Sequence, residues 1–207
     1  LAGDAITTGT HNTAVGFYAL TGTTTASGNS AFGQSSLQNN TTGEYNTGLG
    51  GQTLQTNSTG NYNTAVGVLA AYSNTTGGNN TALGYTSLRQ NTTGGQNVAL
   101  GLQALYYNTT ASNNTAVGHV AMTFNTTGTS NVAVGADALY TNTTASNNTA
   151  VGYQSLYANT TGTRMTSVGS RSGMQNTTGN YNAFFGYDAG ESNTTGASNA
   201  FFGDSAG

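Results

Sequence analysis

The sequence repeats itself at every seventeenth residue, and this period constrains the fold more than any other feature. A string that begins as Asn-Thr-Ala-Val-Gly at Asn12 recurs with small changes at each period up to Asn199. With Asn12 as position 1, a partial coil 1–11 precedes eleven full coils over 12–198, and a partial coil 199–207 follows. A short constant period is typical of stacked repeat proteins. We therefore expect one array without an internal domain boundary and, because it starts and stops within a coil, a segment of a longer one.

Each position of the repeat defines a column of stacked residues, and the columns differ in chemistry. Position 4 is always Val, Leu or Phe, position 5 is always Gly, position 8 is Ala, Ser or Thr, and position 9 is mostly Leu. Positions 12 to 15 read Asn-Thr-Thr-Gly with little change. Because Asn and Gly favour turns, we expect these stretches to turn the chain and the apolar columns, positions 4 and 9, to form the interior.

Composition favours strands over helices. The chain has 40 Thr, 27 Asn and 31 Gly, and Gly and Asn interrupt every coil, which disfavours a helix of any length. We predict two short strands per coil, at positions 1 to 4 and 7 to 10, stacked into parallel sheets. The fold class is an all-β parallel β-solenoid, and about twelve coils at roughly 4.8 Å each give a rod near 55 Å long.

The charged residues test this register independently. Only 4% of the residues are charged, and with the two histidines they fall at positions 6, 7, 10, 16 and 17 alone. Charged side chains avoid interiors unless they are paired, so these five columns are predicted to face solvent. Asp188 follows Arg171 by one coil at position 7, which predicts a surface ion pair of small energetic weight.

An exchange of bulk links positions 3 and 9. In two coils position 9 is Gly instead of Leu, and position 3 is Phe instead of Ala: Gly190 with Phe184, and Gly207 with Phe201. Volume-conserving exchanges are tolerated in packed cores, so the two positions are predicted to fill the same space. Gly173 is an exception, because its own coil has Ser167 at position 3.

Several classes of function lack the residues they need. Three Arg and no Lys cannot neutralise a row of phosphates, so we expect no nucleic-acid partner. There is no Cys, no charged-then-apolar leader and no apolar run near the roughly 18 residues of a membrane span, so we expect no disulfide and no membrane insertion within this segment. His11 and His119 lie about six coils, or roughly 30 Å, apart. We expect no catalytic or metal site and no cofactor, and predict that the chain is not an enzyme.

The motif N-T-A-V-G-x-x-A-L, with Asn-Thr-Thr-Gly between its copies, resembles two groups of repeats. It is similar to the head repeats of trimeric autotransporter adhesins and to repeats in the receptor-binding fibres of tailed phages. The resemblance implies a left-handed parallel β-roll, a homotrimer, and a place outside the cell or on the virion surface. The 17-residue coil is longer than the adhesin head repeat, and this segment contains no stalk, membrane anchor or chaperone domain.

Aromatic residues on the outward columns are the candidate binding residues. Position 6 carries Phe17, Tyr85, Tyr153 and Tyr187, and position 17 carries Tyr45, Tyr62 and Tyr181. Position 10 carries Tyr72, Tyr106, Tyr140 and Tyr157. Such rings can stack on the sugars of a cell-surface glycan or be buried between chains of an oligomer. For position 10 we favour the interface between chains.

The Asn-Thr-Thr triplet is formally an acceptor for N-glycosylation. The candidate acceptors are Asn74, Asn91, Asn108, Asn125, Asn142 and Asn159. The alternative, which we favour, is an Asn that bonds its own turn and stacks on its equivalents as an amide ladder.

The function expected from the sequence is structural: a rigid shaft or head of a phage tail fibre or similar extracellular fibre, which displays or contacts a receptor. A bacterial cell-surface trimeric adhesin is the alternative. An ice-binding solenoid is a third hypothesis, because Thr recurs at positions 13 and 14. Adjacent strand residues point to opposite faces, so we expect only one of these two Thr ranks to face outward.

Overall fold

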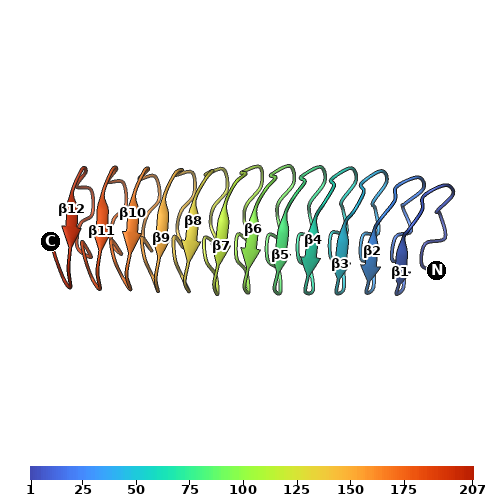
Figure 1. Ribbon diagram of the computed structural model, residues 1–207, viewed down its shortest axis with the longest axis horizontal. Helices are drawn as coiled ribbons and strands as arrows, with labels where there is room; N and C mark the ends of the chain where they lie inside the picture. The colour runs from blue at the N-terminus through green and yellow to red at the C-terminus, as the bar shows by residue number, and fades with distance from the viewer.

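A computed structural model describes residues 1–207 as a straight rod of stacked coils, with the two termini at opposite ends (Figure 1). Each coil contributes one short strand. The strands are β1 (Thr13–Val15), β2 (Ser30–Phe32), β3 (Thr47–Leu49), β4 (Thr64–Val66), β5 (Thr81–Leu83), β6 (Val98–Leu100), β7 (Thr115–Val117), β8 (Val132–Val134), β9 (Thr149–Val151), β10 (Thr166–Val168), β11 (Ala183–Phe185) and β12 (Ala200–Phe202).

The twelve strands form one parallel sheet in sequence order, from β1 to β12. Every strand pairs with the next so that equivalent positions of successive coils are partners, as Thr13 is of Ser30 and Thr166 of Ala183. The predicted β-solenoid is confirmed, and its coil is the 17-residue repeat. The structure contains no helix, and therefore none that is long and apolar enough to cross a membrane.

The sheet faces the interior with position 3 and not with position 4. In β7, Ala116 is fully buried, whereas Thr115 and Val117 on either side of it are partly exposed. Position 4 is more exposed near the ends of the rod, where Val15 is 54% exposed and Phe202 66% exposed. Because side chains alternate across a strand, only one of two neighbouring positions can point inward. The prediction of an interior position 4 is therefore wrong: the small Ala takes the inward place.

The second predicted strand, at positions 7 to 10, is also wrong. This stretch forms turns, and the backbone is left-handed at positions 7 and 9, as at Gln103 (φ 56°) and Leu105 (φ 52°). Alternating left-handed residues cannot lie in an extended strand. Hydrogen bonds between coils continue nonetheless, for example from the Leu105 N–H to the Ala121 carbonyl at 3.1 Å. Only 22 of the 136 backbone hydrogen bonds lie within strands, so the turns carry most of the coil-to-coil bonding.

The hydrophobic core is a thin column of small and medium side chains along the rod. Ala at positions 3 and 8 surrounds Leu at position 9, and Leu105 and Leu139 are both fully buried. No charged side chain is buried, as the sequence predicts. Position 9 is therefore interior as predicted, and it contributes the largest side chain in most coils.

The exchange of bulk between positions 3 and 9 is confirmed in space. A Cβ atom added at Gly190 would lie 2.5 Å from the Phe184 ring, and one added at Gly207 would lie 2.5 Å from the Phe201 ring. A Cβ atom at Gly173 would also meet the Phe184 ring, at 2.6 Å. Phe184 thus occupies space next to the glycines of two coils, its own and the preceding one, which explains the apparent exception at Gly173.

Truncating an interior leucine and an exposed leucine of the same coil should have different effects on stability. We expect Leu105→Ala to lower the free energy of unfolding by about 2–5 kcal/mol, because it leaves a cavity in the core. Leu102→Ala, in the same coil but 41% exposed, should change it by less than about 0.5 kcal/mol. Guanidinium unfolding followed by circular dichroism measures both; equal losses would contradict the assignment of position 9 to the interior.

Gly190 offers a second test, through its contact with Phe184. Ala71 occupies the equivalent position with φ 49°, so the backbone there accepts an L-residue and only space excludes a side chain. We expect Gly190→Ala to cost about 1–3 kcal/mol through overpacking. In a Phe184→Ala background the same substitution should cost little, which a double-mutant cycle detects. Additive losses would show that the two residues do not compete for space.

Candidate functional site

Two buried ladders of asparagine side chains run along the rod, and one of them contains the candidate glycosylation residues. At position 12, Asn108 Nδ2 donates to Asn91 Oδ1 in the preceding coil at 2.8 Å and to the carbonyl of Ala111 in its own coil at 3.0 Å. The same arrangement joins Asn74, Asn91, Asn125, Asn142 and Asn159, all fully buried. The amide ladder that we favour from the sequence is therefore present at position 12.

The second ladder lies at position 1. Asn97 Oδ1 accepts the backbone N–H of Asn114 at 3.0 Å, and Asn97 Nδ2 donates to the Ala111 carbonyl at 2.9 Å. Position 1 and position 12 thus converge on the same carbonyl oxygen at position 15. Met165 replaces Asn in one coil, and there Asn176 Nδ2 lies 3.2 Å from the Met165 sulfur while it still donates to the Gly179 carbonyl at 3.2 Å.

The position 12 ladder bears directly on glycosylation. The amide nitrogen that would carry a glycan is the same Nδ2 that donates two hydrogen bonds inside the rod, as in Asn74 and Asn142. A glycan on this atom would replace one of its two N–H donors, so at least one of these bonds would be lost, and it would need space that the core does not have. In the folded array these six side chains are structural, and a modifying enzyme would have to reach them before the coil closes.

The position 10 tyrosines belong to a continuous stack that also includes residues of position 11. Its members in order along the rod are Tyr72, Arg89, Tyr106, Tyr107, Phe124, Tyr140 and Tyr157. The Arg89 guanidinium lies between two rings, 5.5 Å from the centre of Tyr72 and 5.6 Å from that of Tyr106, and it also donates to the Tyr106 hydroxyl at 2.8 Å. We call these seven residues the aromatic stack.

Several ring faces in the aromatic stack are turned toward neighbouring rings. Tyr140 and Tyr157 have centroids 5.2 Å apart and planes within 7° of parallel, and Tyr107 and Phe124 are stacked at 5.3 Å. Two parallel rings this close cannot lie edge to edge, so their faces overlap. Burial raises the pKa of Tyr157, and the nearby Tyr140 and Asp137 raise it further. These ring faces are occupied by neighbouring rings, which disfavours face-on sugar stacking there.

The aromatic residues of positions 6 and 17 are more exposed. Tyr85, Tyr153 and Tyr187 at position 6 are 50–53% exposed and lie at least two coils apart. Position 17 instead repeats the stacking seen at position 10. Tyr45 and Tyr62 are parallel at 5.4 Å, and Arg164 lies over the ring of Tyr181 and donates to its hydroxyl. The rings of position 6 thus remain the candidates for stacking on a glycan.

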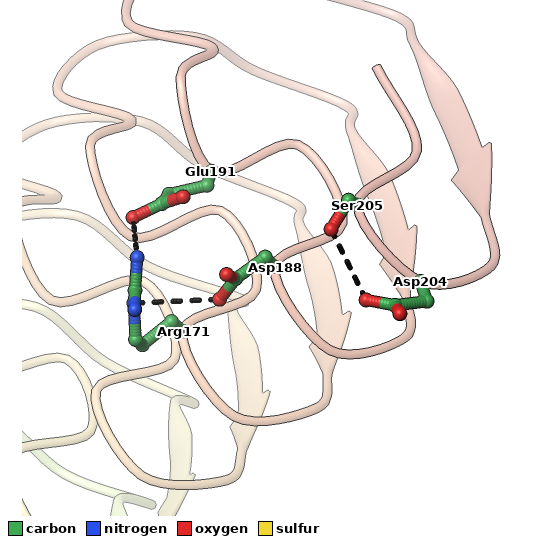
Figure 2. A network of polar contacts seen from close by, with 5 residues as sticks. All are labelled: Arg171, Asp188, Glu191, Asp204 and Ser205. Carbon is green, nitrogen blue, oxygen red and sulfur yellow. Dashed lines mark hydrogen bonds and ion pairs between the residues drawn. The ribbon is translucent and has the colours of Figure 1, made fainter.

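The charged residues gather in the C-terminal coils, where Arg171 bridges two carboxylates of the following coil (Figure 2). Arg171 Nε lies 3.3 Å from Asp188 Oδ1, an ion pair without hydrogen-bond geometry, and the guanidinium also donates to Glu191. The bond to Glu191 raises the pKa of Arg171, so the guanidinium stays charged. The predicted pair of Arg171 with Asp188 is therefore present, and Glu191 is a partner that the sequence did not indicate.

The surface offers no enclosed site. No pocket is present, and no three His, Cys, Asp or Glu side chains lie close enough together to hold a metal ion. His11 and His119 are on different coils, far apart along the rod. Asp204 accepts a hydrogen bond from the neighbouring Ser205 hydroxyl at 3.1 Å, the outermost contact of the same polar region (Figure 2).

The threonines of positions 13 and 14 do not have the strand geometry that we expected from the sequence. Positions 13 and 14 lie in a bend outside the strands, and in the central coils both are exposed to some degree, as at Thr109 and Thr110. Position 13 hydroxyls bond to the carbonyl of the next coil, as from Thr109 to Thr126 at 3.2 Å. Of these two ranks, only the position 14 hydroxyls are free of such bonds and open to solvent.

The feature that sequence reasoning missed is an apolar strip on the outer face of the sheet. It consists of the position 4 side chains, Val15, Phe32, Leu49, Val66, Leu83, Leu100, Val117, Val134, Val151, Val168, Phe185 and Phe202. Their constant apolar character predicts a core column, which the structure contradicts. The signal was nevertheless in the sequence: Ala at position 3 is almost as constant, and the two positions cannot share a face.

The chain is thus a β-solenoid with stacked polar and aromatic ladders. Comparison with protein-family models, with curated proteins and with solved structures finds no match to this chain.

The asparagine ladder yields a prediction with a neighbouring control. Asn40 is fully buried and accepts the Asn57 Nδ2 donor at 2.7 Å, whereas Asn39 is exposed. We expect Asn40→Ala to lower the free energy of unfolding by about 1–3 kcal/mol, because it leaves buried polar groups without partners. Asn39→Ala should have an effect below about 0.5 kcal/mol. Thermal unfolding distinguishes the two, and a neutral Asn40→Ala would contradict a structural role for the ladder.

Proposed function

We propose that this chain is a stiff segment of an extracellular attachment fibre, whose work is to hold a receptor-binding part at a distance from its anchor. The observation that supports it is the unbroken 17-residue register from β1 to β12, which makes every coil the direct continuation of the one before. A rod of this kind gains length by adding coils without a change in cross-section.

The contacts between coils run along the axis of the rod, which suits a stiff segment. Backbone hydrogen bonds, two amide ladders and the aromatic stack all join one coil to the next, as from Asn108 to Asn91 and from Tyr157 to Tyr140. Bending the rod would stretch many of these contacts at once. Stiffness is thus distributed over the whole coil.

The resemblance of the repeat to tailed-phage fibres and to trimeric adhesin heads gives two settings for the same role. A phage tail fibre, on the virion surface, is our first choice, and a bacterial surface adhesin is the alternative. A self-cleaving chaperone domain in the full-length protein would favour the phage fibre, whereas a C-terminal membrane barrel would favour the adhesin. Ice binding would rest on the free hydroxyl rank at position 14, and a thermal hysteresis assay tests it.

Deleting whole coils tests whether this segment sets the length of the fibre. Removal of three whole coils, residues 97–147, keeps all columns in register and should shorten the rod by about 14 Å without loss of cooperative unfolding. Removal of residues 97–146 leaves one extra residue at the junction, and we expect that variant to unfold at a lower temperature. In the full-length protein the first deletion should shorten the fibre in electron micrographs and lower attachment to the host surface. A compact or flexible particle in small-angle scattering would contradict the proposal.

A further inference from the structure

The outer face of the sheet carries the longest apolar surface of the molecule. The position 4 side chains follow one another along all twelve strands, with exposed fractions of 54% at Val15, 50% at Leu49 and 47% at Leu83. The position 2 side chains beside them are Thr, Val, Ser or Ala. We call these two columns the outer strip.

The outer strip contains no charge in any coil. All nine charged side chains lie at positions 6, 7, 10, 16 and 17, although position 4 is as outward-facing as some of these columns. Exposed surfaces usually vary and take up charge, and this one does neither. Its apolar character therefore needs an explanation other than the core of the single chain.

The size of the outer strip fits an interface between proteins. From the fractional exposures, the position 4 side chains leave on the order of 700 Å² in water. With the position 2 side chains, five of which are exposed, the strip exceeds the roughly 800 Å² that each partner contributes to a stable interface of standard size. A patch of this extent is larger than most monomers expose.

We infer that the outer strip packs against the same strip of further copies of this chain, side by side, parallel and in register; this rests on the proposed fibre. In that arrangement each column meets its own equivalents at the same height, because all copies share one coil spacing. A charged column would then oppose its own charge, which disfavours assembly. A strip without charge along its whole length meets this requirement, and the contact repeats at every coil.

The aromatic stack fits this role less well than the outer strip. Its column at position 10 carries Asp4, Arg89 and Glu191, each of which would face its own copy. Arg89 is already held between Tyr72 and Tyr106 within one chain. The inference therefore moves the contact between chains from position 10, where we expected it from the sequence, to positions 2 and 4. A trimer about an axis along the rod remains the stoichiometry implied by the resemblance.

Substitutions within one coil test the inference on the full 207-residue chain. Val117→Asp, on the outer strip, should weaken association by about 100-fold or more, because it places unpaired charges in the interface. Val117→Thr should weaken it far less, and Thr127→Asp, on the exposed position 14 of the same coil, should leave it unchanged. Multi-angle light scattering at micromolar concentration gives the mass, with 20.8 kDa marking the single chain.

Engineered cysteines test the orientation, since the chain has none of its own. With a short bis-maleimide, Val117→Cys should cross-link to the same residue of another copy in high yield. Thr127→Cys should not cross-link. Efficient cross-linking of Thr127→Cys together with none of Val117→Cys would overturn the inference.

Two further outcomes separate this inference from the proposed function. A wild-type chain that stays at 20.8 kDa but scatters as a rod would overturn self-association and leave the fibre segment intact. If Val117→Asp loses the circular dichroism of the strands, position 4 is interior and the outer strip does not exist. A folded single chain of Val117→Asp, beside an assembled wild type, supports the inference.

Discussion

The carbonyl oxygen at position 15 is the point on which each coil closes. It accepts the side-chain amides of two asparagines, at positions 1 and 12, as Ala111 does from Asn97 and Asn108. These amides also bond to the coil next to them, so one buried cluster both closes the turn and sets the stacking register. A coil that is longer or shorter by a single residue would put another side chain, most often Thr, where the amide must be. The constant period follows from this requirement, because buried amides are costly without partners.

Closing a coil within a single repeat requires backbone conformations with positive φ, which are rare for residues other than glycine. All 32 non-glycine residues with positive φ fall at positions 7, 9 and 17. Position 5 is more demanding, since its φ is 117–140° and a Cβ there would come within about 3 Å of the next coil in nearly every case, as at Gly101, where the Gly118 carbonyl is 2.2 Å away. Only glycine fits there. The left-handed residues elsewhere are each costly, and the bonds between coils compensate for them because every coil repeats the same conformation.

The two long sides of the coil present different surfaces. The turn regions carry all the charges, the aromatic stack and the polar region around Arg171. The outer strip on the sheet is uncharged and mostly apolar. In the fibre that we propose, the uncharged face serves the contact between copies and the other faces remain toward solvent. The exposed rings at position 6, such as Tyr153 and Tyr187, lie on the solvent side of that division.

The repeat period is enough to predict the parallel β-solenoid, its coil, the buried Leu column, the asparagine ladder and the columns that admit charge, because a period fixes which residues stack on one another. The period does not say which way each column points. That Ala116 faces the core and Val117 the outside depends on the parity of a short strand, and apolar character alone misassigns it. Positions 7 to 10 have the composition of a strand. The left-handed φ of residues such as Leu105 cannot be recognised from that composition. Only the closed coil decides the direction of each column and the conformation of positions 7 to 10. Closure within a single repeat dictates where the chain must turn, and therefore which side chains are left outside.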